Sequence, residues 1–223
     1  GDAVGTVVWS FTTEADPTIT TFPYTQDFNA VTFPPSGWTT GTSGTAPGWS
    51  RQTVDYNSPP ACAGVPWVSG ATGTSLLTTP SIVLPASHRI KFFWKDDDPN
   101  SPRVADHDTT WFEVSTDGGA TWITLDTLSQ PTPDVTFNEE THDLSAYAGT
   151  ILLRWRDWTD GSTSAWGVGL DDILIEAIPL NSAPTIAYAM ISSTTNGAAI
   201  TLTATITDDF GVDSTVAGAP RLW

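Results

Sequence analysis

Carboxylates dominate the side chains in this sequence that could do chemistry. The segment KDDDPNSPRVADHD, residues 95–108, contains five aspartates, Asp96, Asp97, Asp98, Asp106 and Asp108. Clustered carboxylates either have a function, as a Ca²⁺ site with several oxygen ligands or as an acidic patch that recruits a basic partner, or they are simply a solvated acidic loop. The spacing matches no EF-hand, so the functional and the solvated interpretations both stay open. His107 in the same segment could ligate a transition metal, although a solitary histidine in a polar loop is more often solvated.

Motifs of the common enzyme classes do not occur. The sequence contains no nucleophile elbow, HExxH or P-loop, and its three histidines show no triad pattern with serine. Aspartate is plentiful enough to supply a carboxylate pair for glycoside hydrolysis, but Glu113, Glu139 and Glu140 lie in ordinary strand contexts. We therefore expect a non-enzymatic protein.

The segment EVSTDGGATW, residues 113–122, fits the pattern S-x-D-x-G-x-T-W at Ser115, Asp117, Gly119, Thr121 and Trp122. The pattern is similar to the Asp-box hairpin of sialidase-type propellers. A propeller would repeat it at the spacing of its blades, whereas this chain contains it once. A sialidase would also need an arginine cluster, and the eight basic residues are dispersed. We interpret the segment as a strand, a turn and a strand, with Ser and Asp capping the turn, Gly at positive φ and Trp beneath the loop.

Tryptophan is the second functional signal. Five of the eleven tryptophans adjoin Gly, Pro, Ser or Thr in expected loops: Trp38, Trp49, Trp67, Trp158 and Trp166. An exposed tryptophan can stack on a sugar or anchor a protein partner, but most loop tryptophans fold over the core. In RDWTDGSTSAW we predict that Trp158, with Asp157 and Asp160, faces a ligand.

Composition restricts the partners. With 25 acidic and 8 basic residues the net charge is −17, which repels nucleic acid and anionic lipid. No apolar run approaches the length of a membrane span, and residues 1–30 show no signal peptide. The single cysteine, Cys62, excludes an internal disulfide framework and is expected to be buried. The composition is typical of secreted bacterial β proteins.

Short segments rich in Val, Ile, Thr and aromatic residues, separated by Gly, Pro and Asp, predict an all-β sandwich or barrel. We expect strands at residues 6–13, 26–33, 47–53, 75–84, 88–95, 110–116, 121–126, 139–144, 150–157, 166–176, 185–191 and 199–206. In 89–95 the alternation predicts Ile90, Phe92 and Trp94 on one face. In 150–158 it predicts Ile151, Leu153, Trp155 and Asp157 on one face, with Leu152, Arg154 and Arg156 on the other.

Polar, Pro-bearing linkers divide the chain. We interpret residues 1–19 as the last strand of a fibronectin type III-like domain plus a linker, 20–178 as one sandwich domain, and 179–223 as an incomplete Ig-like domain. Incomplete domains expose unpaired strand edges. Self-association by strand addition between the ends of neighbouring chains is therefore one hypothesis, and a simple proteolytic boundary is the other.

Five segments in order resemble the cleaved adhesin domains of gingipain-type secreted proteins, which are MAM-like or carbohydrate-binding-module-like jelly rolls. They are residues 23–39, 76–96, 113–122, 143–156 and 167–175. The resemblance covers roughly residues 20–178, and the order is more specific than any single motif. It implies an antiparallel jelly roll from a Bacteroidetes-type surface protein.

The resemblance also implies a structural Ca²⁺ that joins the first and last strands, held by Asp27 and Asn29 with Asp171 and Asp172. An acidic residue is commoner in the family at the position of Asn29. Neither face of VGLDDILIEA, residues 168–177, is wholly apolar, and an inward aspartate is costly unless it is paired or bound to metal. We predict that Asp172, on the face of Leu170 and Leu174, is the core ligand. The alternative is that these carboxylates cap turns.

We therefore expect a non-enzymatic, extracellular adhesion module of a larger secreted surface protein, which binds a protein or glycan of a host or neighbouring cell. The alternative is a carbohydrate-binding module attached to a secreted hydrolase. A third class is a structural spacer in a surface fibre. Fold alone does not choose among these functions.

Overall fold

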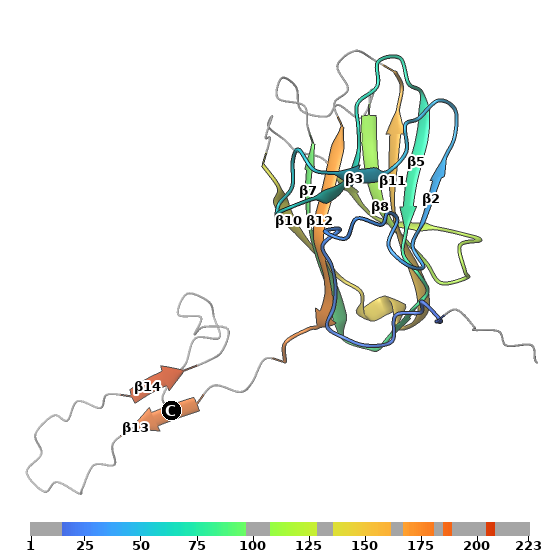
Figure 1. The fold of residues 1–223 in the computed structure, drawn as a ribbon. Helices are drawn as coiled ribbons and strands as arrows, with labels where there is room; N and C mark the ends of the chain where they lie inside the picture. The colour runs from blue at the N-terminus through green and yellow to red at the C-terminus, as the bar shows by residue number, and fades with distance from the viewer. Residues whose placement is uncertain are drawn as a thin grey trace, which may run out of the picture. The chain divides into compact units, whose positions relative to one another are not determined.

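The computed structural model describes residues 15–96, 108–128, 136–161, 167–180, 185–188 and 204–207. The chain divides into two compact units, residues 1–178 and 179–223. The first unit is an antiparallel β-sandwich, and Figure 1 shows its two sheets facing each other.

The first sheet contains β1 (Tyr24–Gln26), β3 (Ser50–Gln52), β4 (Cys62–Val65), β7 (His88–Asp96), β10 (Asn138–Asp143) and β12 (Val168–Ala177). Its order is β10-β7-β12-β4-β3. The first strand, β1, pairs with the last strand of the sandwich, β12, with Gln26 opposite Ile173. The two ends of the sandwich sequence therefore lie side by side, as the family resemblance implied.

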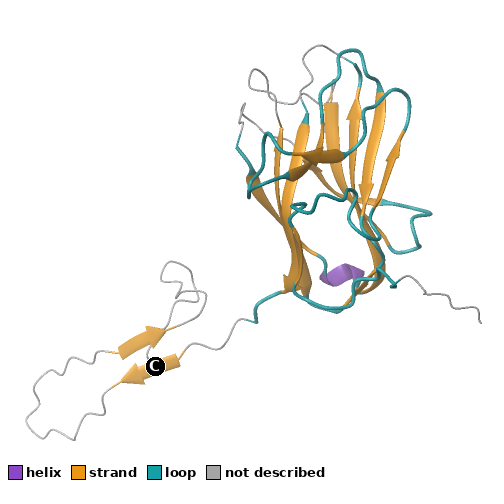
Figure 2. Cartoon of the chain, in the orientation of Figure 1, coloured by secondary structure: helices purple, strands orange, loops and turns teal. Residues whose placement is uncertain are grey.

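The second sheet contains β2 (Thr39–Thr42), β5 (Gly73–Thr78), β6 (Ile82–Leu84), β8 (Asp108–Ser115), β9 (Ile123–Leu128) and β11 (Gly149–Thr159). Its order is β2-β5-β11-β8-β9, and β6 pairs with the first part of β11. Figure 2 shows the short 3-10 helix η1 (Ser145–Tyr147) at one end of the sandwich. Within the described ranges, no helix is long and apolar enough to cross a membrane.

The apolar faces predicted for the central strands are confirmed. Ile90, Phe92 and Trp94 of β7 are almost completely buried, as are Ile151, Leu153 and Trp155 of β11. Phe92 and Phe112 from opposite sheets meet edge to face with ring centroids 5.1 Å apart, and Trp155 packs on both. Burial of these large side chains is the main stabilising contribution to the sandwich.

Strand β12 changes partner halfway along its length. Residues 168–170 pair with β4, residues 173–175 pair with β1, and β7 pairs along the other side. The register with β7 shifts between Asp171 and Leu174, and Asp172 has a φ of 48°. Such a bulge rotates the following side chains relative to strict alternation. The acidic pair therefore lies in the gap between β1 and β4.

Several predicted strands are shorter than expected or divided. The predicted strand 26–33 ends after Gln26, because Phe28 adopts a φ of 54° that no strand allows. The predicted strand 75–84 is two strands, separated at Pro80. Strands β2 and β4 were not predicted, because TTGT and CAGV lack the bulky alternation that signals a strand. The predicted strand 6–13 lies outside the described residues.

The buried core begins slightly before residue 20, the predicted start of the sandwich. Ile19 is 6% exposed, belongs to the core and forms a parallel bridge with Ile82. In the second unit, β13 (Thr185–Tyr188) and β14 (Ala204–Thr207) form an antiparallel pair. Its interpretation as an incomplete Ig-like domain stays a prediction.

Candidate ligand-binding site

A pocket of about 250 Å³ opens where β4 ends and β12 begins. It is lined by Gln52, Val54, Asp55, Cys62, Val65, Pro66, Trp67, Lys95, Gly167, Val168 and Gly169. The side chain of Trp67 is the prominent aromatic surface, because this residue is 46% exposed. The pocket thus combines a solvent-exposed aromatic ring with several hydrogen-bonding groups, as ligand sites commonly do.

Small residues make room for this pocket. Strand β4 reads CAGV and is buried throughout, so β3 and β12 approach it closely on both sides. A Cβ at Gly167 would lie only 2.3 Å from the carbonyl oxygen of Val65, so the backbones touch where the chain leaves β4. Pro66 and Trp67 follow directly. Glycine at position 167 therefore lets β12 start against the segment that carries Trp67.

A buried cation forms one wall of the pocket. Lys95 is 1% exposed, and its Nζ forms an ion pair with Asp55, whose side chain is 51% exposed. The same Nζ lies 5.5 Å from the ring centroid of Phe137. Burying an ammonium group is costly without a partner, so Asp55 and the aromatic ring stabilise it. The Cys62 thiol, buried as predicted, donates to the carbonyl of Asp55 at 2.9 Å.

A smaller pocket of about 20 Å³ shares Val65, Pro66, Trp67 and Gly167 with the first pocket. Asp157 and Asp108 contribute to its lining, together with Thr159 and Gly167. Asp157 is 4% exposed and accepts a hydrogen bond of 2.8 Å from the Thr110 hydroxyl. Its carboxylate is therefore part of the sandwich interior as well as of the pocket wall.

The structure places the residues predicted to face a ligand on different surfaces. Trp158 is half-buried and points to the opposite face of β11 from Asp157, because successive residues of a strand alternate. Asp160 follows the end of β11. Trp38 and Trp49 are buried, and Trp166 lies outside the described residues. Of the five predicted loop tryptophans, Trp67 is the one among the described residues that is exposed and lines a pocket. Its loop context alone did not distinguish it from the other four.

Two of the predicted calcium-site residues, Asp171 and Asp172, lie at the gap in the first sheet. Asp171 is completely buried, and its Oδ2 accepts from the backbone N–H groups of Asn57 at 2.9 Å and Ser58 at 3.0 Å. Asp172 accepts from the Asn57 side-chain amide at 2.8 Å and the Ser58 hydroxyl at 2.7 Å. The segment 57–58 therefore closes over the acidic pair.

Asp27 and Asn29 follow directly after β1, on the β1 side of this gap. Asp27 accepts from the backbone N–H of Asn29 at 3.1 Å and from its side-chain amide at 3.0 Å. Asn29 Oδ1 in turn accepts from the Ala61 N–H at 3.2 Å. The carboxylates of Asp27, Asp171 and Asp172 bind separate donors in this arrangement, so a shared cation would have to exchange some of these hydrogen bonds.

The expectation that Asp172 lies on the buried face of the strand is wrong, whereas its role as a metal ligand stays a prediction. Asp171 is 0% exposed, whereas Asp172 is half-buried, because the bulge interrupts the alternation assumed for residues 168–177. Burial raises the pKa of Asp171 to about 6 and the nearby Asp172 charge adds to the increase, while hydrogen bonds from Ser58, Asp172 and Asn57 oppose it. A buried carboxylate with a raised pKa is a site that a cation would stabilise.

The acidic segment 95–108 is only partly described. Asp96 is the last residue of β7 and Asp108 the first of β8, where Asp108 is 6% exposed. Asp97, Asp98, Asp106 and His107 lie outside the described residues. A second metal site or acidic patch in this segment stays a prediction.

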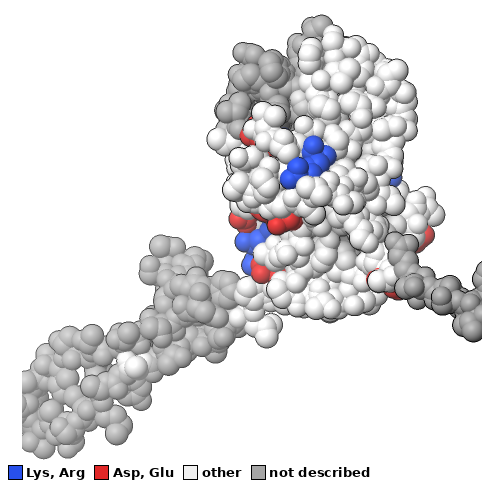
Figure 3. Space-filling view, viewed as in Figure 1, with Lys and Arg blue, Asp and Glu red and all other residues white. Residues whose placement is uncertain are grey.

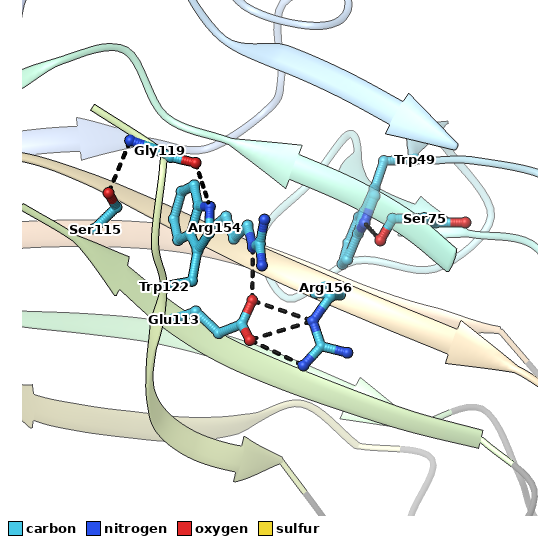
Figure 4. Close-up of polar contacts among 8 residues, drawn as sticks. All are labelled: Trp49, Ser75, Glu113, Ser115, Gly119, Trp122, Arg154 and Arg156. Carbon is cyan, nitrogen blue, oxygen red and sulfur yellow. Dashed lines mark hydrogen bonds and ion pairs between the residues drawn. The ribbon is translucent and has the colours of Figure 1, made fainter. Parts of the chain in front are cut away.

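The EVSTDGGATW segment is a hairpin, as predicted, with the capping roles expected for each residue. Ser115 Oγ accepts from the Gly119 N–H at 2.8 Å, and the Trp122 indole donates to the Gly119 carbonyl at 3.0 Å (Figure 4). Asp117 accepts from the backbone and hydroxyl of Thr121. These hydrogen bonds, with that from Ser115, hold the pKa of Asp117 down at about 2. All of these contacts stabilise the turn.

Beside the hairpin, Glu113 lies between two arginines of β11. Arg154 Nε donates to it at 2.6 Å and Arg156 at 2.9 Å, as Figure 4 shows. Burial raises the pKa of Glu113, but the arginines outweigh burial and hold it below its usual value. The guanidinium groups also lie 3.9 Å from the Trp122 ring centroid and 3.7 Å from that of Trp111. The arginines therefore cover these rings, which form a packed outer face of the sheet.

On the face shown in Figure 3, charged side chains form small separate patches on a mostly uncharged described surface. The net charge of −17 is therefore not concentrated on this face.

No known protein-family profile matches the sequence, and no curated protein is significantly similar to it. Solved structures similar to it include the K1 cleaved adhesin domain of Lys-gingipain from Porphyromonas gingivalis W83. That domain is 21% identical, with a TM-score of 0.53 over 69% of this chain and 97% of that chain. The chain has the gingipain-type cleaved-adhesin fold.

Two further adhesin domains of Lys-gingipain support the same conclusion. The K2 domain is 18% identical over 68% of this chain and 98% of its own, with a TM-score of 0.52. The K3 domain from P. gingivalis W83 is 19% identical over 69% and 98%, with a TM-score of 0.52. At these identities the similarity establishes the jelly-roll fold, and function has to be argued from the site.

Proposed function

We propose that the sandwich is a non-catalytic, extracellular binding module that recognises a glycan in the pocket beside Trp67. The observation that carries this proposal is the exposed indole of Trp67 beside an approximately 250 Å³ pocket with polar groups on its wall. The adhesin-type fold and the absence of a membrane-spanning helix among the described residues are compatible with a secreted module.

The chemistry of the pocket suits a sugar ring. The apolar C–H face of a pyranose stacks on an indole, while its hydroxyls need both donors and acceptors. Lys95 supplies a donor, Asp55 an acceptor and Gln52 both, and all three lie on the pocket wall. The volume is slightly below the roughly 300–1,000 Å³ of pockets for drug-sized ligands, which favours one or two sugar units.

The same residues argue against hydrolysis at this pocket. Glycoside hydrolysis usually needs two carboxyl groups on either side of the scissile bond. Among the described residues that line the pocket, Asp55 is the one carboxylate, and it is paired with Lys95. We therefore infer binding without catalysis.

We also propose a structural Ca²⁺ at the gap between β1 and β4, held by Asp27, Asn29, Asp171 and Asp172. The donor types fit, because Ca²⁺ prefers carboxylate and amide oxygens, and among the described residues no cationic side chain pairs with the buried Asp171 carboxylate. Bound there, the ion would supply positive charge to Asp171 and tie the ends of β1 and β12 together. The residues themselves already hold segment 57–58 over the gap.

The test is the Trp67→Ala variant of the complete chain, compared with wild type on a glycan array and then by calorimetry with the best glycan. We expect a loss of about 2 kcal/mol in binding free energy, or roughly 30-fold in Kd, as for a central aromatic anchor. Trp158→Ala is the matched control, because Trp158 is half-buried on β11 and lines neither of the two pockets that Trp67 lines. Equal glycan binding by wild type and Trp67→Ala would refute the site.

Other outcomes would identify other ligands. Capture of a purified host or neighbouring-cell surface protein, lost in Trp67→Ala without any glycan binding, would make the module a protein adhesin. Concentration-dependent dimers or longer assemblies in native mass spectrometry would instead support self-association, including assembly into a fibre.

A further inference from the structure

Three potential metal ligands meet between the edge strands of the two sheets. Asp126 lies on β9, while Glu140 and His142 lie on β10. One oxygen from each carboxylate and one imidazole nitrogen all lie within 4.8 Å of one another. In the described part of the chain, β9 and β10 are the end strands of different sheets. The three residues therefore bridge one open side of the sandwich.

The register explains why these polar side chains point inward. Asp126 pairs with Phe112, Glu140 with Phe92 and His142 with Ile90. Directly opposite residues of an antiparallel pair project from the same face, and all three partners are 0% exposed. Positions that face the core thus carry two acids and a histidine.

The histidine lacks a hydrogen-bond partner where one is needed. Its ring stacks on Phe92 at 5.7 Å and packs on Phe112 at 5.1 Å between centroids. Nε2 is buried and has no hydrogen-bond partner among the described residues, and the nearest ion-pair atom, Asp126 Oδ2, is 3.6 Å away. Buried polar atoms nearly always have a hydrogen-bond or metal partner, so this nitrogen, beside the two carboxylates, is available to bind a cation.

The surroundings hold the ligands as a metal site requires. Trp94 Nε1 donates to Glu140 Oε1 at 3.2 Å, which orients the carboxylate while its second oxygen can still bind a metal ion. Burial lowers the pKa of His142 despite the charges of Asp126 and Glu140, and a neutral imidazole is the form that ligates. The Asp126 side chain is 39% exposed, so an ion can enter from solvent.

The donor set selects the class of ion. One imidazole nitrogen with two carboxylates suits zinc-class transition metals, whereas Ca²⁺ prefers oxygen ligands alone. Bonds of about 2.0–2.2 Å in a tetrahedral site place ligand atoms roughly 3.3–3.6 Å apart. Small side-chain rotations would bring the present arrangement to that spacing. Two carboxylates and a neutral imidazole also balance a divalent charge.

We propose that Asp126, Glu140 and His142 bind a divalent transition-metal ion of the zinc class, with water as the fourth ligand, and that the ion clamps the edge strands β9 and β10 of the two sheets together.

The experiment is calorimetric titration of the complete, untagged, metal-stripped chain with Zn²⁺ in excess Ca²⁺, which occupies oxygen-only sites. We expect one zinc per chain, and tetrahedral d–d absorption when Co²⁺ replaces it. His142→Phe should weaken binding on the order of 100-fold or more, since a ligand is lost and remaining ligands cannot compensate. Phenylalanine fills the slot between Phe92 and Phe112, and an unchanged melt without metal would confirm that the variant folds.

The controls separate this site from others. His107→Ala should bind Zn²⁺ as wild type does, and Asp126→Asn should bind it more weakly while leaving glycan binding unchanged. Absence of zinc binding by the wild type would show that the inward charges only protect strand edges from pairing, and would overturn the proposal. Equal zinc binding by His142→Phe and wild type, or loss in His107→Ala alone, would overturn it as well.

Discussion

At the scale of single residues, Asp171 decides the electrostatics of the gap between β1 and β4. Its carboxylate is completely buried beside Asp172 and is held by backbone N–H groups of Asn57 and Ser58. Because burial raises its folded-state pKa to about 6, above the ordinary 3.8, its contribution to stability is present below pH 3.8 and is lost as pH rises through about 6. Near neutral pH the site therefore favours a cation.

We predict that Asp171→Asn removes this pH dependence. In EDTA, the unfolding free energy of the wild type relative to that of the variant should fall by roughly 2–3 kcal/mol between pH 4 and pH 7.5. Each unit of pKa shift corresponds to about 1.4 kcal/mol. Denaturant melts at several pH values measure it. Excess Ca²⁺ at pH 7.5 should raise the wild-type midpoint more than that of Asp171→Asn. Parallel pH profiles in EDTA would show that Asp171 titrates normally, and equal responses to Ca²⁺ would remove the calcium site.

At the scale of secondary-structure elements, β4 shows how small residues create the site. Its CAGV sequence lets β3 and β12 pair on both sides of a buried strand. Trp67 follows two residues after β4 and therefore lies beside the pocket. A Cβ at Gly64 would lie 2.9 Å from the Val168 carbonyl oxygen and 2.8 Å from Gln52 Cγ. The position therefore requires glycine, because the backbone of β12 and the side chain of Gln52 occupy the space that a Cβ would need.

We predict that Gly64→Ala lowers the unfolding free energy by about 1–3 kcal/mol, because β4 and β12 must separate to admit the methyl group. Gly41→Ala in β2 is the matched control, since its nearest contact would be Leu76 Cδ1 at an ordinary 3.5 Å. Urea melts of both variants give the comparison. Equal stabilities of the two variants would contradict this account of β4.

At the scale of the whole molecule, the sandwich contains its own core. Among the described residues, the hydrophobic core lies between Ile19 and Ile175, and just after β12 the Ile178 N–H donates to the Ser87 carbonyl at 2.8 Å. A domain with a complete core folds without its flanking segments.

A chain that ends at Leu180 should therefore melt within about 2 °C of the full chain, which corresponds to less than about 1 kcal/mol for a domain of this size. Calorimetry of the two chains measures the difference. A much lower midpoint for the shorter chain would mean that residues beyond 180 contribute to the stability of the sandwich.

Sequence patterns by themselves determined the fold class, the inward faces of β7 and β11 and the hairpin at 113–122. These features depend on local alternation and turn chemistry, which neighbouring residues specify. Tertiary structure alone decided that Asp171 rather than Asp172 is the fully buried carboxylate, because a bulge at a change of strand partner interrupts the alternation and the segment at Asn57 and Ser58 covers Asp171. It also decided that Trp67 borders the pocket and that Asp126 meets His142, since those positions depend on how separate strands and sheets pack. Alternation in NEETHD, residues 138–143, could have placed Glu140 and His142 on one face, but no local signal connects them to β9 in the opposite sheet.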